Sequence, residues 1–209
     1  MNNKTKNIIK WALCAVAAIL AIIIAINIKN GKILDLDLKI YQFFKLNIIN
    51  DKLTPIVKVI THIGGAKIVI ALSILAIILI KGVKNKLFIL TGIVGTAGLN
   101  VILKHIIQRE RPNINRLIPE KGYSFPSGHA MMSMAFYGML IFLIFKYVKN
   151  TALKWTLIVI LTILLATIGM TRIYLGVHYP SDVIGGFLVS LTYLFILTEI
   201  YNRIKIEEK

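Results

Sequence analysis

Three polar segments of the chain carry residue types that suit the chemistry of an anion. In the first, "YSFPSGHA" at 123–130, Ser127 precedes an apolar run and is a natural helix N-cap. The N–H groups of Gly128 and His129 would then lie at the positive end of a helix dipole. Gly128 allows a ligand to approach the backbone, and His129 exchanges a proton near neutral pH. The segment predicts an anion site, although an ordinary capped helix start has the same residues.

The second segment, "TRIYLGVHYPSD" at 171–182, combines a cation, a histidine and a carboxylate. Asp182 follows His178 by four residues and can accept its Nδ1–H, which leaves Nε2 free as a nucleophile. Arg172 closes the preceding apolar run, and Pro180 suits the first turn of the next helix. An interfacial histidine with a capping aspartate is the alternative interpretation.

The third segment, "KHIIQRERP" at 104–112, supplies two further cations. Lys104 and Arg111 lie seven residues apart, so they share a face for as far as the helix continues. Pro112 disfavours helix at the residue before it, and we therefore expect Arg111 at the helix end. The alternative is that both side chains only reach for the membrane interface.

The composition indicates which elements position these segments. Hydrophobic residues make up 57% of the 209 residues and the mean hydropathy is +0.77, above the roughly 45–50% apolar content of soluble domains. The net charge of +16 comes from Lys and Arg between apolar runs, which favours a lipid surface or an anionic substrate over nucleic acid. Cys14 is the sole cysteine, which excludes an intrachain disulfide and a cysteine-based metal cluster.

Six apolar runs predict an all-α, polytopic membrane bundle of six transmembrane helices with both termini on the same side. A spanning helix needs about 20 residues, so the second run is expected to begin upstream, near Pro55, and the fourth near Ser127. A short interfacial helix is expected within 29–53. The chain is interpreted as one membrane domain, with the first helix and connector at 1–50, a catalytic bundle at 51–201 and a polar tail at 202–209. The runs are 11–28, 66–80, 87–103, 130–145, 155–170 and 183–201.

Alternate connectors of an up-and-down bundle lie on the same side, so the three segments can converge at one membrane face. Together they supply three cations, two histidines, one carboxylate and a helix N-terminus. This set matches the needs of phosphoryl transfer without a metal: charge stabilisation on oxygen, a nucleophile, and an acid for the leaving group. No cofactor and no metal are expected.

At these residues the sequence resembles the type 2 phosphatidic acid phosphatases, membrane lipid phosphatases related to vanadium-dependent haloperoxidases. The matching patterns are Lys, six residues, Arg-Pro at 104–112; Pro-Ser-Gly-His at 126–129; and Arg, five residues, His, three residues, Asp at 172–182. Thr171 departs from the serine usual in the family but keeps a hydroxyl. The resemblance covers roughly 51–201.

The resemblance implies a role for each matching residue. His178 would attack phosphorus and form a phosphohistidine, with Asp182 orienting the ring. His129 would protonate the leaving alkoxide and then activate water. The remaining matches would hold the phosphate oxygens: Lys104, Arg111, Ser127, Gly128 and Arg172. Four charges match no family position and are expected to be solvated loop charges: Arg109, Glu110, Arg116 and Lys121.

The leading hypothesis is a lipid phosphatase acting on phosphatidate, phosphatidylglycerophosphate or a polyprenyl diphosphate. A specific undecaprenyl-diphosphate phosphatase, an oxidase that uses vanadate, and a non-catalytic lipid-binding or transport protein are the alternatives. The sequence sets no oligomeric state.

Charge counts bear on the orientation of the chain in the cell membrane. With both termini in the cytoplasm, cytoplasmic segments hold 12 Lys and Arg, and the other side holds the remaining 13 of 25. Leaving out Lys104, Arg111 and Arg172, which the site would hold, gives 12 against 10. That difference favours an active site on the extracytoplasmic face, and the family resemblance points the same way.

Overall fold

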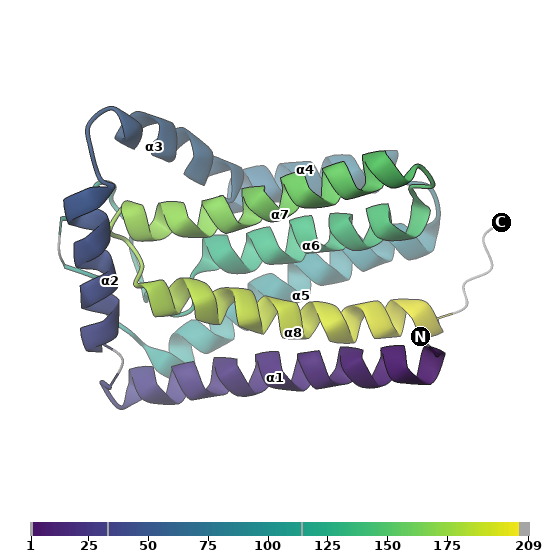
Figure 1. Cartoon of the computed structure of the whole chain (residues 1–209), viewed down its shortest axis with the longest axis horizontal. Coiled ribbons are helices and arrows are strands. Elements are labelled where there is room, and N and C mark those ends of the chain that lie inside the picture. The colour runs from purple at the N-terminus through teal and green to yellow at the C-terminus, as the bar shows by residue number, and fades with distance from the viewer. Residues whose placement is uncertain (1, 33, 114, 205–209) are drawn as a thin grey trace.

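The computed structural model describes residues 2–32, 34–113 and 115–204, and within these ranges the regular secondary structure is entirely helical. Long helices run up and down, and one short helix, α2, crosses the end of the bundle opposite the two termini (Figure 1). Part of the predicted polar tail, 205–209, lies outside the described residues. The helices are α1 (Asn3–Lys29), α2 (Leu34–Asn47), α3 (Leu53–Ile63), α4 (Ala66–Leu79), α5 (Val83–Ile107), α6 (Gly128–Tyr147), α7 (Thr151–Tyr174) and α8 (Pro180–Arg203).

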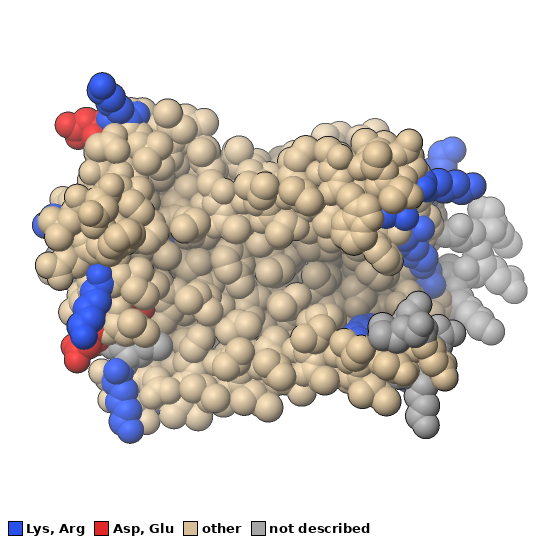
Figure 2. Space-filling view, in the orientation of Figure 1, with Lys and Arg blue, Asp and Glu red and all other residues tan. Residues whose placement is uncertain are grey.

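The prediction of an all-α bundle with six apolar spans is confirmed. Five helices are individually long and apolar enough to cross a bilayer: α1, α5, α6, α7 and α8. The sixth span is the pair α3 and α4, which meet at a 45° bend. Lys and Arg gather at the two ends of the visible face, and a broad belt between them is almost free of charge (Figure 2). This distribution fits a bundle whose middle lies in hydrocarbon.

Local signals explain where the helices near the site begin. Ser127 has an extended backbone and its side chain accepts a hydrogen bond from the Ala130 N–H, so α6 starts as predicted. Pro180 is the first residue of α8, where its missing N–H costs nothing. The predicted interfacial helix within 29–53 is α2.

The end of α5 differs from the prediction. Gln108 adopts a left-handed conformation with φ of 53°, and its N–H donates to the Lys104 carbonyl, so the helix stops at Ile107. Arg111 therefore does not sit at the helix end on a face shared with Lys104. It lies four residues further on, in the loop that leads to α6.

The bend between α3 and α4 lies beside α6 and α7. Gly64 is buried there, and a Cβ at this position would lie 2.2 Å from Ile168 Cγ2 and 2.7 Å from Ser133 Oγ. Only glycine lets the backbone pass so close to α7. The bend interrupts the predicted single span and places the start of α4 next to the polar segments.

Candidate active site

His178 and Asp182 form a buried pair at the end of the bundle that α2 crosses. His178 is 2% exposed and lies between α7 and α8, and Asp182 is fully buried in the first turn of α8. The predicted contact is present, with His178 Nδ1 3.5 Å from Asp182 Oδ2. On the other side of the ring, Arg111 Nη1 donates to Nε2 at 3.1 Å. Because arginine cannot accept a hydrogen bond, Nε2 carries a lone pair and Nδ1 carries the proton.

Burial also keeps this imidazole neutral. Removal from water lowers the pKa of His178 to about 4, and the Arg111 guanidinium acts in the same direction, while Asp182 partly opposes both. At neutral pH the ring is therefore uncharged, with a lone pair on Nε2, which is the form required of a nucleophile.

Asp182 is held by more partners than the sequence indicated. Arg109 Nη1 donates to its Oδ1 at 2.7 Å, the Tyr179 N–H donates to Oδ2 at 2.8 Å, and the Ser124 hydroxyl also donates to Oδ2. These bonds fix the carboxylate against the His178 ring. Nothing in the local sequence marks Ser124, because its partner is 58 residues away.

Arg109 is not a solvated loop charge, and that prediction was wrong. Its side chain is 9% exposed, and its second nitrogen donates to Asp37 Oδ2 at 2.6 Å. The guanidinium also lies 4.0 Å over the Tyr179 ring. Arg109 is buried because it neutralises two carboxylates, Asp37 and Asp182, that would otherwise be buried without a counter-charge. Glu110, Arg116 and Lys121 are exposed, as expected.

Asp37 joins α2 to the start of α8. It is 1% exposed and accepts from the Ser181 N–H at 2.9 Å and from the Ser181 hydroxyl at 2.6 Å. The helix that crosses the end of the bundle thus buttresses the turn that carries Asp182. The sequence alone predicted only a short interfacial helix within 29–53 and did not single out Asp37.

The three predicted cations converge from different elements. Arg111 donates to the carbonyls of Gly122 and Val177, both at 2.9 Å, and so ties the loop after α5 to the loop before α8. Lys104, near the end of α5, donates to the Tyr123 carbonyl and interacts electrostatically with Arg111 and Arg172. Arg111 contacts Nε2 of the His178 ring, and Arg172 interacts with the ring electrostatically.

Arg172 is the most deeply buried of these cations. It is 1% exposed, its Nη1 donates to Thr61 Oγ1 at 2.8 Å, and its Nη2 is paired with Glu120. Its Nε is buried and has no hydrogen-bond partner among the residues that the structure describes. A buried donor without a partner costs free energy, and an arriving acceptor would recover it.

Glu120 places a carboxylate where the arginines meet. Besides its contact with Arg172, its Oε2 lies 4.0 Å from Arg111 Nη2. Glu120 was not among the predicted site residues, since nothing local to the loop reveals a partner on α7. Its negative charge stands where the phosphate oxygens of a substrate would be expected.

The start of α6 faces the same region. Ser127 is fully buried, and its N–H donates to the Asp182 carbonyl at 3.0 Å, so its backbone is already engaged. Gly128 and His129 form the first turn of α6. His129 and Arg172 line a cavity of about 550 Å³, and His129 interacts electrostatically with His178 and Arg111. Both histidines thus face one polar region from different elements.

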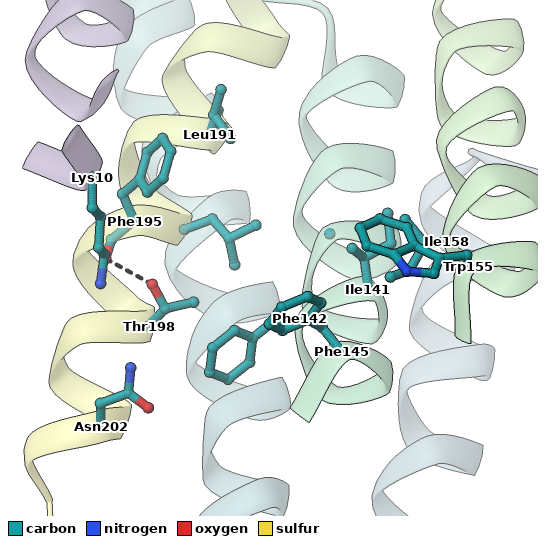
Figure 3. A pocket seen from close by; sticks show the side chains of 12 residues that line it. Lys10, Ile141, Phe142, Phe145, Trp155, Ile158, Leu191, Phe195, Thr198 and Asn202 are labelled. Atoms are coloured by element: carbon teal, nitrogen blue, oxygen red, sulfur yellow. Dashed lines mark hydrogen bonds between the residues drawn. The ribbon is translucent and has the colours of Figure 1, made fainter. Parts of the chain in front are cut away.

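A second cavity, of about 490 Å³, lies at the opposite end of the bundle. Figure 3 shows Phe142, Phe145 and Trp155 among the side chains around it, with Lys10 and Asn202 toward one side. Lys10 is already paired with Glu199 at 3.0 Å. This apolar cavity contains no group suited to attack phosphorus, so the candidate site is at the α2 end.

The donor types around the site favour an anion. Among residues 2–32, 34–113 and 115–204, no group of three or more His, Cys, Asp or Glu side chains is arranged to hold a metal ion. The polar groups that converge are mainly guanidinium, ammonium and imidazole nitrogens. They match phosphate oxygens in charge and in hydrogen-bonding capacity.

Comparisons with known proteins agree with this geometry. A sequence profile described as the PAP2 superfamily matches residues 85–206. The chain is 34% identical over 108 residues to phosphatidylglycerophosphatase B of Bacillus subtilis (strain 168), covering 51% of this chain and 53% of that protein. It is 31% identical over 170 residues to undecaprenyl-diphosphatase BcrC of the same organism, covering 75% and 81%.

A solved structure extends the similarity to nearly the whole chain. The crystal structure of a transmembrane PAP2 type phosphatidylglycerolphosphate phosphatase from Bacillus subtilis superimposes with a TM-score of 0.84 at 26% identity. The superposition covers 93% of this chain and 98% of that one. By contrast, the sequence match to phosphatidylglycerophosphatase B spans about half the length of that relative.

Proposed function

The chain belongs to the PAP2 superfamily, and from this membership and the geometry of the site we propose that it is a membrane phosphatase that hydrolyses phosphate esters of lipids. The observation that carries the proposal is the buried His178–Asp182 pair, with Nε2 of the histidine facing Arg111. A protein that only bound headgroups would need the cations but not an oriented imidazole, so the pair favours catalysis over binding.

The first half of the reaction transfers the phosphoryl group to the protein. Lys104, Arg111 and Arg172 hold the phosphate oxygens, together with the N–H of Gly128 and the Ser127 hydroxyl. Nε2 of His178 attacks phosphorus, and the bond between phosphorus and the leaving oxygen breaks. His129 gives its proton to that oxygen, and Asp182 stabilises the positive charge that forms on the His178 ring.

The second half releases inorganic phosphate. His129, now unprotonated, takes a proton from a water molecule that attacks the phosphohistidine. The bond between phosphorus and Nε2 breaks, phosphate leaves, and both histidines return to their starting protonation states. The cations neutralise the charge on the equatorial oxygens in both halves, so the reaction needs no metal ion.

The site lies at the end of a membrane bundle, which supports a long-chain substrate. A phosphate can occupy the polar site while the hydrocarbon stays between helices or in the bilayer. Each buried methylene contributes about 0.8 kcal/mol, so a long chain strongly favours binding. Phosphatidate, phosphatidylglycerophosphate and polyprenyl diphosphates are the substrates proposed, and the names of the relatives support the latter two.

Phosphate release by purified protein in mixed micelles tests the proposal. Long-chain lipid phosphates should exceed glycerol phosphate in kcat/KM by orders of magnitude, and His178→Ala should abolish turnover. Equal efficiency on glycerol phosphate would refute recognition of the tail. Substantial phosphate release by His178→Ala would refute the nucleophile.

We also propose that the protein lies in the cell membrane with its termini in the cytoplasm and its active site on the outer face. Figure 1 places both termini at the end remote from α2. Lys121 is exposed beside the site, so a cysteine placed there can report the orientation once the native Cys14 has been replaced by alanine. Lys121→Cys should react with an impermeant thiol reagent in intact cells. Labelling only after lysis would reverse the orientation.

A further inference from the structure

The cavity that His129 and Arg172 line continues to the bend between α3 and α4. It is also lined by basic side chains that the reaction above does not use: Lys58, His62 and Lys67. Lys58 and His62 lie four residues apart on α3, so they share one face of that helix, and Lys67 is in the first turn of α4. The cavity is thus lined by the proposed catalytic groups, by the Glu120 carboxylate, and by two lysines and a histidine that the proposed reaction does not use.

Neither Lys58 nor Lys67 forms an ion pair with a carboxylate in the part of the chain that the structure describes. Gly65, the N-cap of α4, has no side chain that could accept a hydrogen bond from the first turn of the helix. Arg172 and Glu120, which are paired with each other, line the same cavity. A ligand that paired with Lys58 and Lys67 would be an anion.

The position of the cavity indicates which part of the substrate would carry that anion. His129 protonates the leaving oxygen, so the leaving group lies next to His129 and enters this cavity. Diacylglycerol, the leaving group from phosphatidate, is neutral and would leave Lys58 and Lys67 without a partner. A leaving group with its own phosphate or phosphodiester would bring the negative charge that these lysines match.

We propose that this cavity, lined by Lys58, His62 and Lys67, is a subsite for a second anionic phosphorus group carried by the leaving group. The inference rests on the proposed function and narrows it to lipids with two phosphorus groups, such as diphosphate monoesters. For a diphosphate, His178 attacks the terminal phosphorus, and the bond from that atom to the bridging oxygen breaks. The bridging oxygen takes the proton of His129 and leaves as the lipid monophosphate. Water then releases inorganic phosphate from His178.

A matched pair of substrates tests the subsite. Farnesyl diphosphate and farnesyl monophosphate share one tail, so their ratio of kcat/KM isolates the second phosphate. The wild type should prefer the diphosphate. Lys58→Gln and Lys67→Gln should each lower that preference about tenfold, equivalent to about 1.4 kcal/mol, and the double variant should lower it further. Lys45→Gln removes an exposed lysine of α2 at the same end of the bundle and should leave the ratio unchanged.

The outcomes separate the subsite from the phosphatase itself. If the wild type released no phosphate from either compound, or His178→Ala released as much, the proposed function would fail. If the wild type hydrolysed both and the double variant kept the wild-type ratio, only the subsite would be refuted. A double variant that changed only the response to an anionic bystander lipid would likewise overturn the subsite and assign the lysines to the membrane surface.

Discussion

Replacing Glu120 with glutamine should strengthen the binding of phosphate. The carboxylate of Glu120 contacts Arg172 and lies 4.0 Å from Arg111 Nη2, where it neutralises two cations proposed to hold the substrate. A phosphate that binds both arginines has to displace it. Glutamine keeps the shape of the side chain but removes the competing charge. The arginines therefore bind phosphate at a lower cost in free energy.

The structure sets the size of this effect. A hydrogen bond to a charged group contributes about 1.5–3 kcal/mol, which is an upper limit because glutamine still forms a weaker bond to Arg172. The Glu120 side chain is 28% exposed and regains hydration when displaced, which reduces the difference again. A net change near 1.4 kcal/mol remains, so the inhibition constant of inorganic phosphate should fall roughly tenfold.

Competitive inhibition of lipid hydrolysis by inorganic phosphate measures this directly. Glu110→Gln is the matched control, because Glu110 is an exposed carboxylate of the same loop and its removal changes the net charge equally. We expect Glu110→Gln to leave the inhibition constant unchanged. If Glu120→Gln instead weakened inhibition by phosphate, the Glu120 carboxylate would help phosphate to bind by positioning Arg172. Phosphate would then not displace Glu120 from the arginines.

Three further predictions concern the catalytic pair, its support and the charge of the site. The rate at which His178 is phosphorylated can be measured by rapid mixing and quenching in alkali. It should persist as the pH falls through about 6.5, the ordinary pKa of histidine, and should be lost near pH 4, since His178 is neutral above its lowered pKa. Loss centred near pH 6.5 would contradict this. Arg109→Gln leaves Asp37 and Asp182 without their counter-charge and should reduce stability by about 3–5 kcal/mol. Thermal unfolding in detergent measures that loss, and Asp37→Asn in the same chain should recover part of it. Activity should survive EDTA because Lys104, Arg111 and Arg172 neutralise the phosphate; loss that magnesium restores would show a metal requirement.

Local signals made the main helices and the catalytic motifs predictable. Apolar runs located the spans, the N-cap residue Ser127 located the start of α6, and Pro180 located the start of α8. The contact between His178 and Asp182 was also predictable, because the two residues are four positions apart and one turn of backbone joins them. These features depend on short stretches of chain.

Features that depend on distant partners were not predictable from the sequence. Arg109 looked like a loop charge because Asp37 and Asp182 are each more than 70 residues away from it. Glu120 had no local signal, since its main partner Arg172 is 52 residues further along. The end of α5 was misplaced because Gln108 adopts a left-handed conformation that is uncommon for residues other than glycine.

Arg172 links the catalytic cations to the proposed subsite. Its two terminal nitrogens contact Glu120 and Thr61, whereas its Nε is buried without a partner among the described residues, and the residue lines the cavity that reaches Lys58 and Lys67. A terminal phosphate would take the nitrogen that Glu120 occupies, and the next phosphorus group along the leaving group would approach from the cavity. Arg111, in contrast, contacts His178 and the loop carbonyls and does not line this cavity. In the proposed reaction the two arginines are therefore not equivalent: Arg111 would act on the phosphate that is transferred, and Arg172 would lie where the transferred phosphate and the leaving group meet.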